Sequence, residues 1–486
     1  MTETSERAAN EYSVPLPLPS YRLIILLAWP VLAQQGLNLV IGFSDRYLAG
    51  NYADLMQESQ HGGDRQAALQ AAQTTANYLA WFISSFSVLI SAGSTALVAR
   101  FTGARDHDLA ERVTHQSLLL SVVLGGLVTL AALAGGLRWL IGILHLRDEA
   151  AVFANDYLEP LFALLVFQVL ETAGIACLIG AGDTRTGLWV SAGVAVVNLP
   201  LAWGLCLGRG PFPHLGFVGI SLGTALSHCM GAGVVLFLLT RGRSGLRLHW
   251  MLLWPRLDLI WRLLRISVPA GLDSLSLVVG QFWFLSIIND LGNEASSAHG
   301  IAIHWEALGY LSGGAFGTAA TALVGQNLGA GRPGEASHSG WLAFRLGCGV
   351  MTFMGVVFFI LAPWMFQLFC PNESQRPIID LGVPVLRLVA FAMPGLASAI
   401  VFSCALRGAG DTRVPVLFTW TGFFVVRLPL AYYLALPEVD LGPLGVVTGC
   451  NLGLLGAWWA MLADLWVRGV FFMHRFARGP WQKQRV

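Results

Sequence analysis

The six residues GAGDTR occur twice in this chain, at 180–185 and again at 408–413, 228 positions apart. An apolar stretch precedes and follows each copy, and the whole chain is 55% hydrophobic with only 12% charged residues. Soluble domains carry about 25% charged residues, so this composition indicates a membrane protein. Because the copies are identical and far apart, they predict that the chain is an internal duplication.

The repeated motif has three competing interpretations: a phosphate-binding loop, a pair of catalytic aspartates, or a structural turn. A phosphate loop lies between a strand and a helix and is followed by Lys-Ser or Lys-Thr, whereas both copies here lie between apolar helices. As a turn, its glycines would end one helix, its aspartate would cap the next, and its arginine would anchor the cytoplasmic side. The residues concerned are Gly180, Gly182, Asp183 and Arg185, and Gly408, Gly410, Asp411 and Arg413.

Apolar stretches long enough to cross a bilayer, about 20 residues each, recur along the chain. We expect an all-α membrane protein with twelve spanning helices. Their approximate bounds are 22–48, 75–99, 115–144, 157–180, 187–207, 216–240, 263–291, 296–324, 339–369, 379–407, 414–436 and 443–472. Pro30 and Pro269 lie early in the first and seventh spans, where each is expected to bend the helix.

The duplication predicts two lobes of six spans each, an N-lobe at 22–240 and a C-lobe at 263–472. An even number of spans gives both lobes the same orientation, so a pseudo-two-fold axis along the membrane normal should relate them. The remaining segments are a cytoplasmic linker at 241–262, cytoplasmic tails at 1–21 and 473–486, and a polar outer-loop insertion at 51–70.

The distribution of positive charge predicts the orientation. With both termini in the cytoplasm, 21 of the 29 Lys and Arg residues fall in cytoplasmic segments, six in outer segments, and two, Arg387 and Arg427, within spans. This asymmetry favours a multi-pass protein of the cell inner membrane with both ends inside. The net charge of +1 argues against a nucleic-acid partner. The seven cysteines form no CxxC pair, so neither a zinc site nor a disulfide framework is indicated.

Several motifs, taken in order, make the chain resemble the multidrug and toxic compound extrusion family, in particular its bacterial branch. They are WPVLAQQGLNLVIGFSDRYLAG (29–50), both GAGDTR turns, SVPAGLDSL (267–275) and AHGIAIHWEALGYLSGGAFGTAATALVGQNLGAGRPGEA (298–336). The resemblance implies a secondary antiporter that expels organic cations or other amphipathic compounds in exchange for Na⁺ or H⁺. It implies alternating access, no cofactor, no resident metal and function as a monomer.

Acidic side chains inside the spans are the main candidates for function, because each costs roughly 3 kcal/mol in the bilayer on insertion scales. Asp45 matches the aspartate of the family's first span, which implies a role in cation coupling. The alternative is an interfacial residue paired with Arg46. Asp273 lies four residues after Pro269 and could hold an ion or proton with the backbone groups that the proline frees. Its alternative is a hydrogen bond across the bundle.

Five further residues lie on the expected ion or substrate pathway. His299 and Glu306 are seven residues apart and share a helix face, which we expect to point to the cavity between the lobes. His299 would carry a proton there or bond a backbone carbonyl. Glu171 is an unusual acid in the fourth span, and Asn198 matches an asparagine that the family keeps near its first-half ion site. Arg427 should neutralise one of the acids, or extend outward to the interface.

The repeat places the neutral Gln34 opposite Asp273, so ion coupling is expected to be asymmetric between the lobes. Tyr78, Trp283 and Trp305 are expected to line the cavity and stack on cationic substrates. The alternative to an exporter is a lipid-linked oligosaccharide flippase of a related superfamily, which would need a cavity rich in Arg and Lys. The charges within the spans are expected to be mostly acidic. An enzyme would need paired catalytic residues on an aqueous loop, and the sequence offers none.

Overall fold

The computed structural model of the chain describes residues 18–55, 85–143, 148–249, 254–371, 373–440 and 446–484. Within them, eleven helices are long and apolar enough to cross a membrane. A twelfth span is formed by α6 (Asp148–Ala163) and α7 (Leu165–Gly180), which are bent by 50° where they meet. The predicted all-helical membrane class is confirmed. The insertion at 51–70, from residue 56 on, and the N-terminal tail up to residue 17 lie outside the described residues.

The helices follow one another in two groups. The first group contains α2 (Tyr21–Leu55), the helix Ser85–Gly103, α4 (His107–Ala131), the short π-helix η1 (Ala132–Gly136), α5 (Leu137–Ile143), α6, α7, α8 (Thr184–Leu207) and α9 (Phe217–Thr240). The second group contains α10 (Leu257–Asn289), α11 (Asn293–Gly329), α12 (Pro333–Gln367), α13 (Arg376–Gly408), α14 (Arg413–Trp420), the π-helix η5 (Thr421–Arg427), α15 (Leu428–Ala435) and α16 (Gly453–Arg478).

The predicted start of the twelfth span at residue 443 is wrong. Strand β1 (Glu438–Asp440) pairs antiparallel with β2 (Val446–Thr448), and α16 begins only at Gly453, which has a φ of +57°. The β-branched residues of β2 are apolar but favour an extended backbone, so hydropathy alone misassigned them. The other end also differs, because α16 continues to Arg478, and the Trp481 ring is buried and stacks on Phe476 at 4.5 Å.

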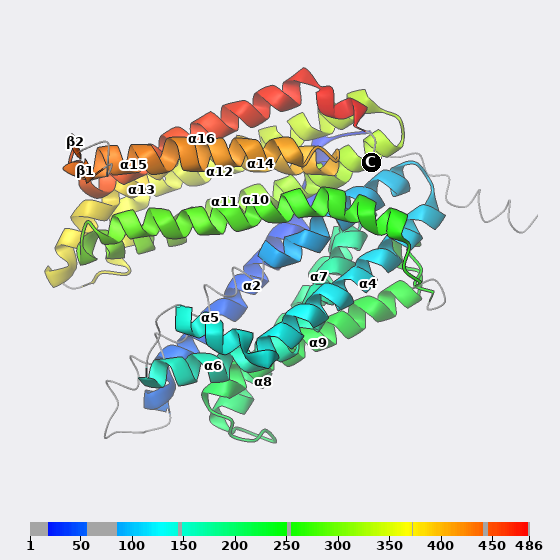
Figure 1. Cartoon of the computed structure of the whole chain (residues 1–486), viewed down its shortest axis with the longest axis horizontal. Coiled ribbons are helices and arrows are strands. Elements are labelled where there is room, and N and C mark those ends of the chain that lie inside the picture. The colour runs from blue at the N-terminus through cyan, green and yellow to red at the C-terminus, as the bar shows by residue number, and fades with distance from the viewer. Residues whose placement is uncertain are drawn as a thin grey trace, which may run out of the picture.

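The two groups of helices form two bundles that lie close together at one end and spread apart at the other (Figure 1). At the joined end the Gln326 side-chain amide of α11 donates to the Gly180 carbonyl, at 2.9 Å. The Gly93 amide likewise donates to the Ser267 hydroxyl of α10, at 2.9 Å. Gly180 is the first residue of a GAGDTR copy, so the repeated turns mark the end at which the lobes meet. The β1–β2 hairpin, α5 and α6 lie at the spread end (Figure 1).

The N-terminal parts of α2 and α10 each pack against the other lobe. Leu27 and Ala28 of α2 belong to a buried cluster made otherwise of C-lobe side chains, including Phe402. Leu263 and Ile266 of α10 belong to a cluster made otherwise of residues from the N-lobe and the linker that follows it. This reciprocal exchange between corresponding helices is what a duplicated chain with a two-fold relation is expected to give.

Both repeated turns use glycine where the backbone is left-handed. Gly182 has a φ of +91° and Gly410 a φ of +86°, which other residues adopt only with strain. Gly180 and Gly408 are the last residues of α7 and α13, so the motif ends the helix as predicted. The arginine of each copy is exposed.

In the first copy the aspartate caps the next helix, as predicted. Asp183 accepts hydrogen bonds from the Thr186 amide at 2.9 Å and the Thr186 hydroxyl at 2.7 Å. It also accepts from Arg243 at 2.9 Å and Ser244 at 2.7 Å. Burial would raise the pKa of Asp183, but the bonds from Thr186 and Ser244 and the charge of Arg243 outweigh it and hold that pKa below its ordinary value.

In the second copy the predicted cap is absent. Asp411 instead accepts two hydrogen bonds from the Arg475 guanidinium, at 3.0 and 2.8 Å, and Thr412 precedes α14 without a side-chain cap. Two differences account for this. Val414 stands where the first copy has Thr186, so a hydroxyl donor is missing, and Arg475 on the last turn of α16 supplies a stronger, charge-assisted bond.

The joined end depends on two glycines whose backbones meet the other lobe. A Cβ at Gly103 would overlap the Gln326 carbonyl oxygen, and a Cβ at Gly329 would overlap the Arg100 carbonyl oxygen. We therefore expect Gly103→Ala to lower the melting temperature of the purified protein by several degrees, because overpacking typically costs 1–3 kcal/mol. Gly126→Ala in α4 is the control, since a Cβ there meets nothing within 4 Å. Equal melting temperatures for the two variants would contradict this account of the joint.

Candidate functional site

A buried hydrogen-bonded chain in the N-lobe contains the first predicted acid. Asp45 of α2 is 6% exposed, and its Oδ2 accepts a hydrogen bond from the Thr224 hydroxyl of α9 at 3.1 Å. The Thr224 oxygen in turn accepts from the Asn198 amide of α8 at 2.8 Å. Asp45 and Asn198, predicted separately, are thus brought together by Thr224, which the sequence did not single out.

The expected alternative for Asp45, an ion pair with Arg46, is not what the structure shows. The Arg46 guanidinium points instead to His304 of α11, with Nη1 and Nε2 3.2 Å apart. Asp45 Oδ1 and Asn198 Oδ1 are both buried and have no hydrogen-bond partner among the described residues. Unpartnered acceptor oxygens of this kind are the groups that a proton or a small cation satisfies in proteins.

The second acid of the N-lobe has a histidine partner. Glu171 of α7 is 5% exposed, and its Oε2 lies 2.8 Å from Nδ1 of His228 in α9. His228 lies one helical turn after Thr224 on α9, and Thr224 donates to Asp45, so this imidazole lies near both acids of the N-lobe. Sequence reasoning missed His228, although a histidine within an apolar span was a sufficient signal. Gln34 of α2 is partly buried, near Gly187 of α8.

In the C-lobe, Asp273 is neutralised within the protein. It is 2% exposed and forms an ion pair with Arg407 at the end of α13. The sequence assigned Arg407 to a cytoplasmic segment, so this partner was not foreseen. This ion pair joins two helices, so it agrees with the alternative prediction for Asp273, a bond across the bundle. The position expected to be symmetric with it, Gln34, carries no charge.

A second ion-paired cluster in the C-lobe is centred on Asp464 of α16, which is fully buried. Arg427 donates to it from Nε at 2.8 Å and approaches it with Nη2 at 2.7 Å. Arg468 donates from Nε and Nη2, both at 2.7 Å. Arg427 lies at the end of the π-helix η5, and such segments often occur at functional sites.

This cluster corrects three expectations. Arg427 pairs with Asp464 and not with a predicted acid, and its side chain is only 3% exposed, so it does not extend outward. Arg468, which the sequence placed in a cytoplasmic segment, is also buried. With Arg407, three arginines therefore lie within the C-lobe, where they equal in number the acids Asp273, Glu306 and Asp464. The sequence missed Asp464 because its partners come from another span and from its own next helical turn.

Glu306 and His299 share a face of α11 but lie in different surroundings. Glu306 is partly exposed and lies within electrostatic range of Arg427 and Arg468, without an ion pair in the described part of the chain. His299 is 6% exposed, with its ring 5.8 Å from that of Phe284 and 5.4 Å from that of Trp458. The expectation that His299 faces a cavity is wrong, because aromatic rings enclose it.

The predicted cavity aromatics are not gathered at one place. Trp283 is 49% exposed and its Nε1 donates to the Tyr432 hydroxyl at 3.1 Å. Trp305 is partly buried, with its ring edge-on to Phe369 at 5.8 Å. Tyr78 lies outside the described residues. Within those residues, no group of three His, Cys, Asp or Glu side chains could hold a metal ion.

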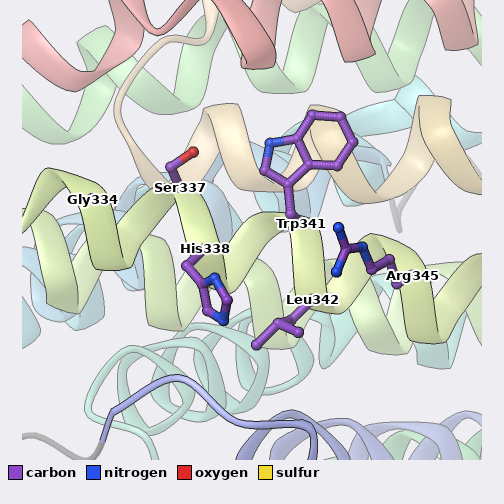
Figure 2. Close-up of a pocket in the computed structure, with 6 residues that line it drawn as sticks. All are labelled: Gly334, Ser337, His338, Trp341, Leu342 and Arg345. Carbon is purple, nitrogen blue, oxygen red and sulfur yellow. The ribbon is translucent and has the colours of Figure 1, made fainter.

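One surface hollow, of about 300 Å³, lies away from these networks (Figure 2). All of its lining residues belong to the first half of α12. They are Gly334, Ser337, His338, Trp341, Leu342 and Arg345. None of the buried acids contributes to it, so the candidate site lies in the side-chain networks inside the two bundles.

The Asp464 cluster predicts unequal effects of two substitutions. Asp464→Asn leaves two buried guanidinium groups without a counter-ion, a loss expected to cost about 3–5 kcal/mol. Arg427→Gln leaves Asp464 still held by two bonds from Arg468 and should cost much less. Thermal unfolding of the purified variants tests this order. A variant Asp464→Asn that is as stable as Arg427→Gln would show that the cluster is not a paired unit.

Comparison with known proteins identifies the family. A family model described as MatE matches residues 65–203 and 269–433. A probable multidrug resistance protein NorM from Thermotoga maritima is 26% identical over 467 residues, which cover 95% of this chain and 93% of that protein.

Two solved structures share the fold. A MATE protein in complex with MaL6 gives a TM-score of 0.83 at 19% identity, covering 95% of this chain and 97% of its own. A multidrug resistance MATE family transporter of the MOP superfamily, in an outward-facing conformation, gives 0.81 at 20% identity, covering 95% and 96%. Because the family model matches more than half of its length, this chain belongs to the MATE family of multidrug efflux transporters, which are not enzymes.

Proposed function

We propose that this protein is a secondary antiporter of the inner membrane that exports organic cations, or amphipathic metabolites, in exchange for Na⁺ or H⁺. The observation that carries the proposal is the pair of buried, unpartnered acceptor oxygens on Asp45 and Asn198. A carboxylate in an apolar bundle is costly unless a cation or proton compensates it. A site that is stable only when occupied couples ion binding to conformation.

The coupling ion binds in the N-lobe. Asp45 and Asn198 each leave one acceptor oxygen unpartnered and are linked through the Thr224 hydroxyl, and such oxygen ligands suit Na⁺. Protonation of Asp45 would remove its charge equally well. His228 and Glu171 lie near Asp45 and provide a route for a proton. Asp273 is a weaker candidate, because Arg407 already balances its charge.

Alternating access follows from the two lobes at 22–240 and 263–472. The lobes are joined at the end that carries the GAGDTR turns and spread at the opposite end (Figure 1). With both termini in the cytoplasm, the joined end faces the cytoplasm and the arrangement is open to the outside, as in the outward-facing relative. Each lobe acts as a rigid unit, and one chain suffices for transport.

The substrate class rests on the relatives, which are described as multidrug resistance proteins. Partly or fully exposed aromatic side chains such as Trp283 and Tyr310 provide faces on which planar cations stack. A lipid-linked oligosaccharide flippase remains a weaker second candidate, since the relatives are described as multidrug resistance proteins.

Efflux of ethidium from proteoliposomes or cells, with Na⁺ and pH gradients imposed separately, tests the proposal. We expect one gradient to drive export, and Asp45→Asn to reduce the gradient-driven rate at least tenfold, because an amide cannot exchange charge with the coupling ion. Asp258→Asn is the matched control, since this aspartate is exposed at the start of α10.

The control should retain the wild-type rate under both gradients. Absence of gradient-driven export of any cationic compound would refute the antiport proposal. A normal rate in Asp45→Asn would leave antiport standing and move the coupling site elsewhere.

A further inference from the structure

The unpartnered polar atoms inside the spans differ in kind between the lobes. In the N-lobe they are the acceptor oxygens of Asp45 and Asn198, apart from Arg100 Nη1 and Thr184 Oγ1 at the helix ends near the GAGDTR turn. In the C-lobe, N–H donors predominate among the described residues. These donors are Trp305 Nε1, Arg407 Nε, Arg427 Nη1 and Trp458 Nε1, beside one acceptor oxygen, Asp273 Oδ1, and one ring nitrogen, His299 Nδ1. Donors without acceptors indicate a ligand group that brings acceptors.

Arg427 is the centre of this donor set. It is 2% exposed, and one carboxylate, Asp464, serves both Arg427 and Arg468, so the triad carries one excess positive charge. The guanidinium lies over the Phe423 ring at 4.2 Å and the Phe284 ring at 5.6 Å, which hold it in place without supplying an acceptor. The His299 ring contacts both Phe284 and Trp458. Trp458, with its unpartnered Nε1 donor, therefore lies near the Phe284 ring over which the Arg427 guanidinium is placed.

Glu306 is the acid that faces the triad from α11. It lies within electrostatic range of Arg427 and Arg468, yet neither guanidinium forms an ion pair with it. Glu306 is partly exposed, and Tyr310, one turn further along α11, is 52% exposed. Glu306 is therefore both partly accessible and within electrostatic range of the buried triad.

We propose that the Arg427 triad is a binding site for the carboxylate group of a transported compound. The exported compounds are then zwitterionic amphiphiles, whose carboxylate binds Arg427 in the C-lobe. This inference rests on the proposed export function and narrows its substrate class. Arg427 Nη1 donates to the carboxylate in a charge-assisted hydrogen bond, and Trp458 Nε1 offers a second donor nearby.

Glu306 acts in this scheme as an internal competitor. When it is ionised it offers its own carboxylate to Arg427, and when it is neutral it leaves the guanidinium to the substrate. Loss of its charge should therefore strengthen binding of a carboxylate-bearing compound and leave a compound without a carboxylate unaffected. A merely structural role of Glu306 would not strengthen the binding of the carboxylate-bearing compound alone. The direction of the change in affinity therefore distinguishes competition from a structural role.

The test is a binding measurement on the purified full chain with two dyes that differ only in the carboxylate. Rhodamine B carries a carboxylate and a delocalised cation, and its ethyl ester keeps only the cation. By fluorescence polarisation we expect Arg427→Gln to weaken rhodamine B about 10- to 100-fold, the range of a charged hydrogen bond, and to change the ester less than threefold. Glu306→Gln should strengthen rhodamine B alone.

Arg387→Gln is the matched control, because Arg387 is exposed on α13 and lies against Phe359. It should leave both affinities unchanged. If Arg427→Gln does not fold, the affinity of Glu306→Gln for the two dyes is sufficient to test the proposal. Equal loss of both dyes in Arg427→Gln, or no effect of Glu306→Gln on rhodamine B, would overturn the carboxylate site.

A chloride arm distinguishes a substrate carboxylate from a bound inorganic anion. Replacement of chloride by methanesulfonate, which has no carboxylate, should not change the ratio of the two dye affinities by more than twofold. If that ratio changes only with chloride, the triad binds the inorganic ion and the proposal fails. These measurements need no gradient, so failure of the antiport proposal would appear in the efflux assay and not here.

Discussion

A polar atom inside a membrane bundle has no water to bond, so it needs a partner within the protein or from a ligand. Most features of this molecule follow from that constraint. Glu171 is held by His228, Asp273 by Arg407, and Asp464 by two arginines at once. All of these pairs join different helices except Asp464–Arg468, which lies within α16, so the charges also fix how the helices of one lobe pack. The atoms left without partners are few, and they mark where the protein is completed by what it transports.

The two lobes share a scaffold and differ in charge. The duplication gives both of them the same turn, the same exchange of their first helices and the same glycine contact at the joined end. At the ion-site position the N-lobe has Asn198, and the repeat places Arg427 of the C-lobe beside it. Asn198 leaves an acceptor oxygen unpartnered, and Arg427 leaves an N–H donor unpartnered. This difference in unpartnered atoms underlies our proposals of a cation or proton site in the N-lobe and a carboxylate site in the C-lobe.

The sequence predicted the repeat-level features well, because they depend on local patterns. The GAGDTR copies located the duplication and the inner turns, and the apolar runs located most of the spans to within several residues, while the predicted start of the second span at 75 lies outside the described residues. Asp45 and Asn198 followed from family resemblance. Arg407 and the Arg427–Asp464 pair did not, because an ion pair between distant spans leaves no periodic or spacing signal in one chain. His228 and the i,i+4 pair of Asp464 with Arg468 did leave a local signal, which was overlooked. Asp411 was predicted by analogy with Asp183 and was wrong, since an arginine 64 residues away outcompetes the local backbone.

The central claim is that occupancy of the Asp45 network controls the joint between the lobes. It is tested most directly by the distance between spin labels at positions 185 and 413, the exposed arginines of the two turns, in otherwise cysteine-depleted protein. Addition of the coupling ion should shift the distance distribution in the wild type and in Asp273→Asn, and should leave it unchanged in Asp45→Asn. A shift of the same size in Asp45→Asn, or its loss in Asp273→Asn alone, would contradict the account.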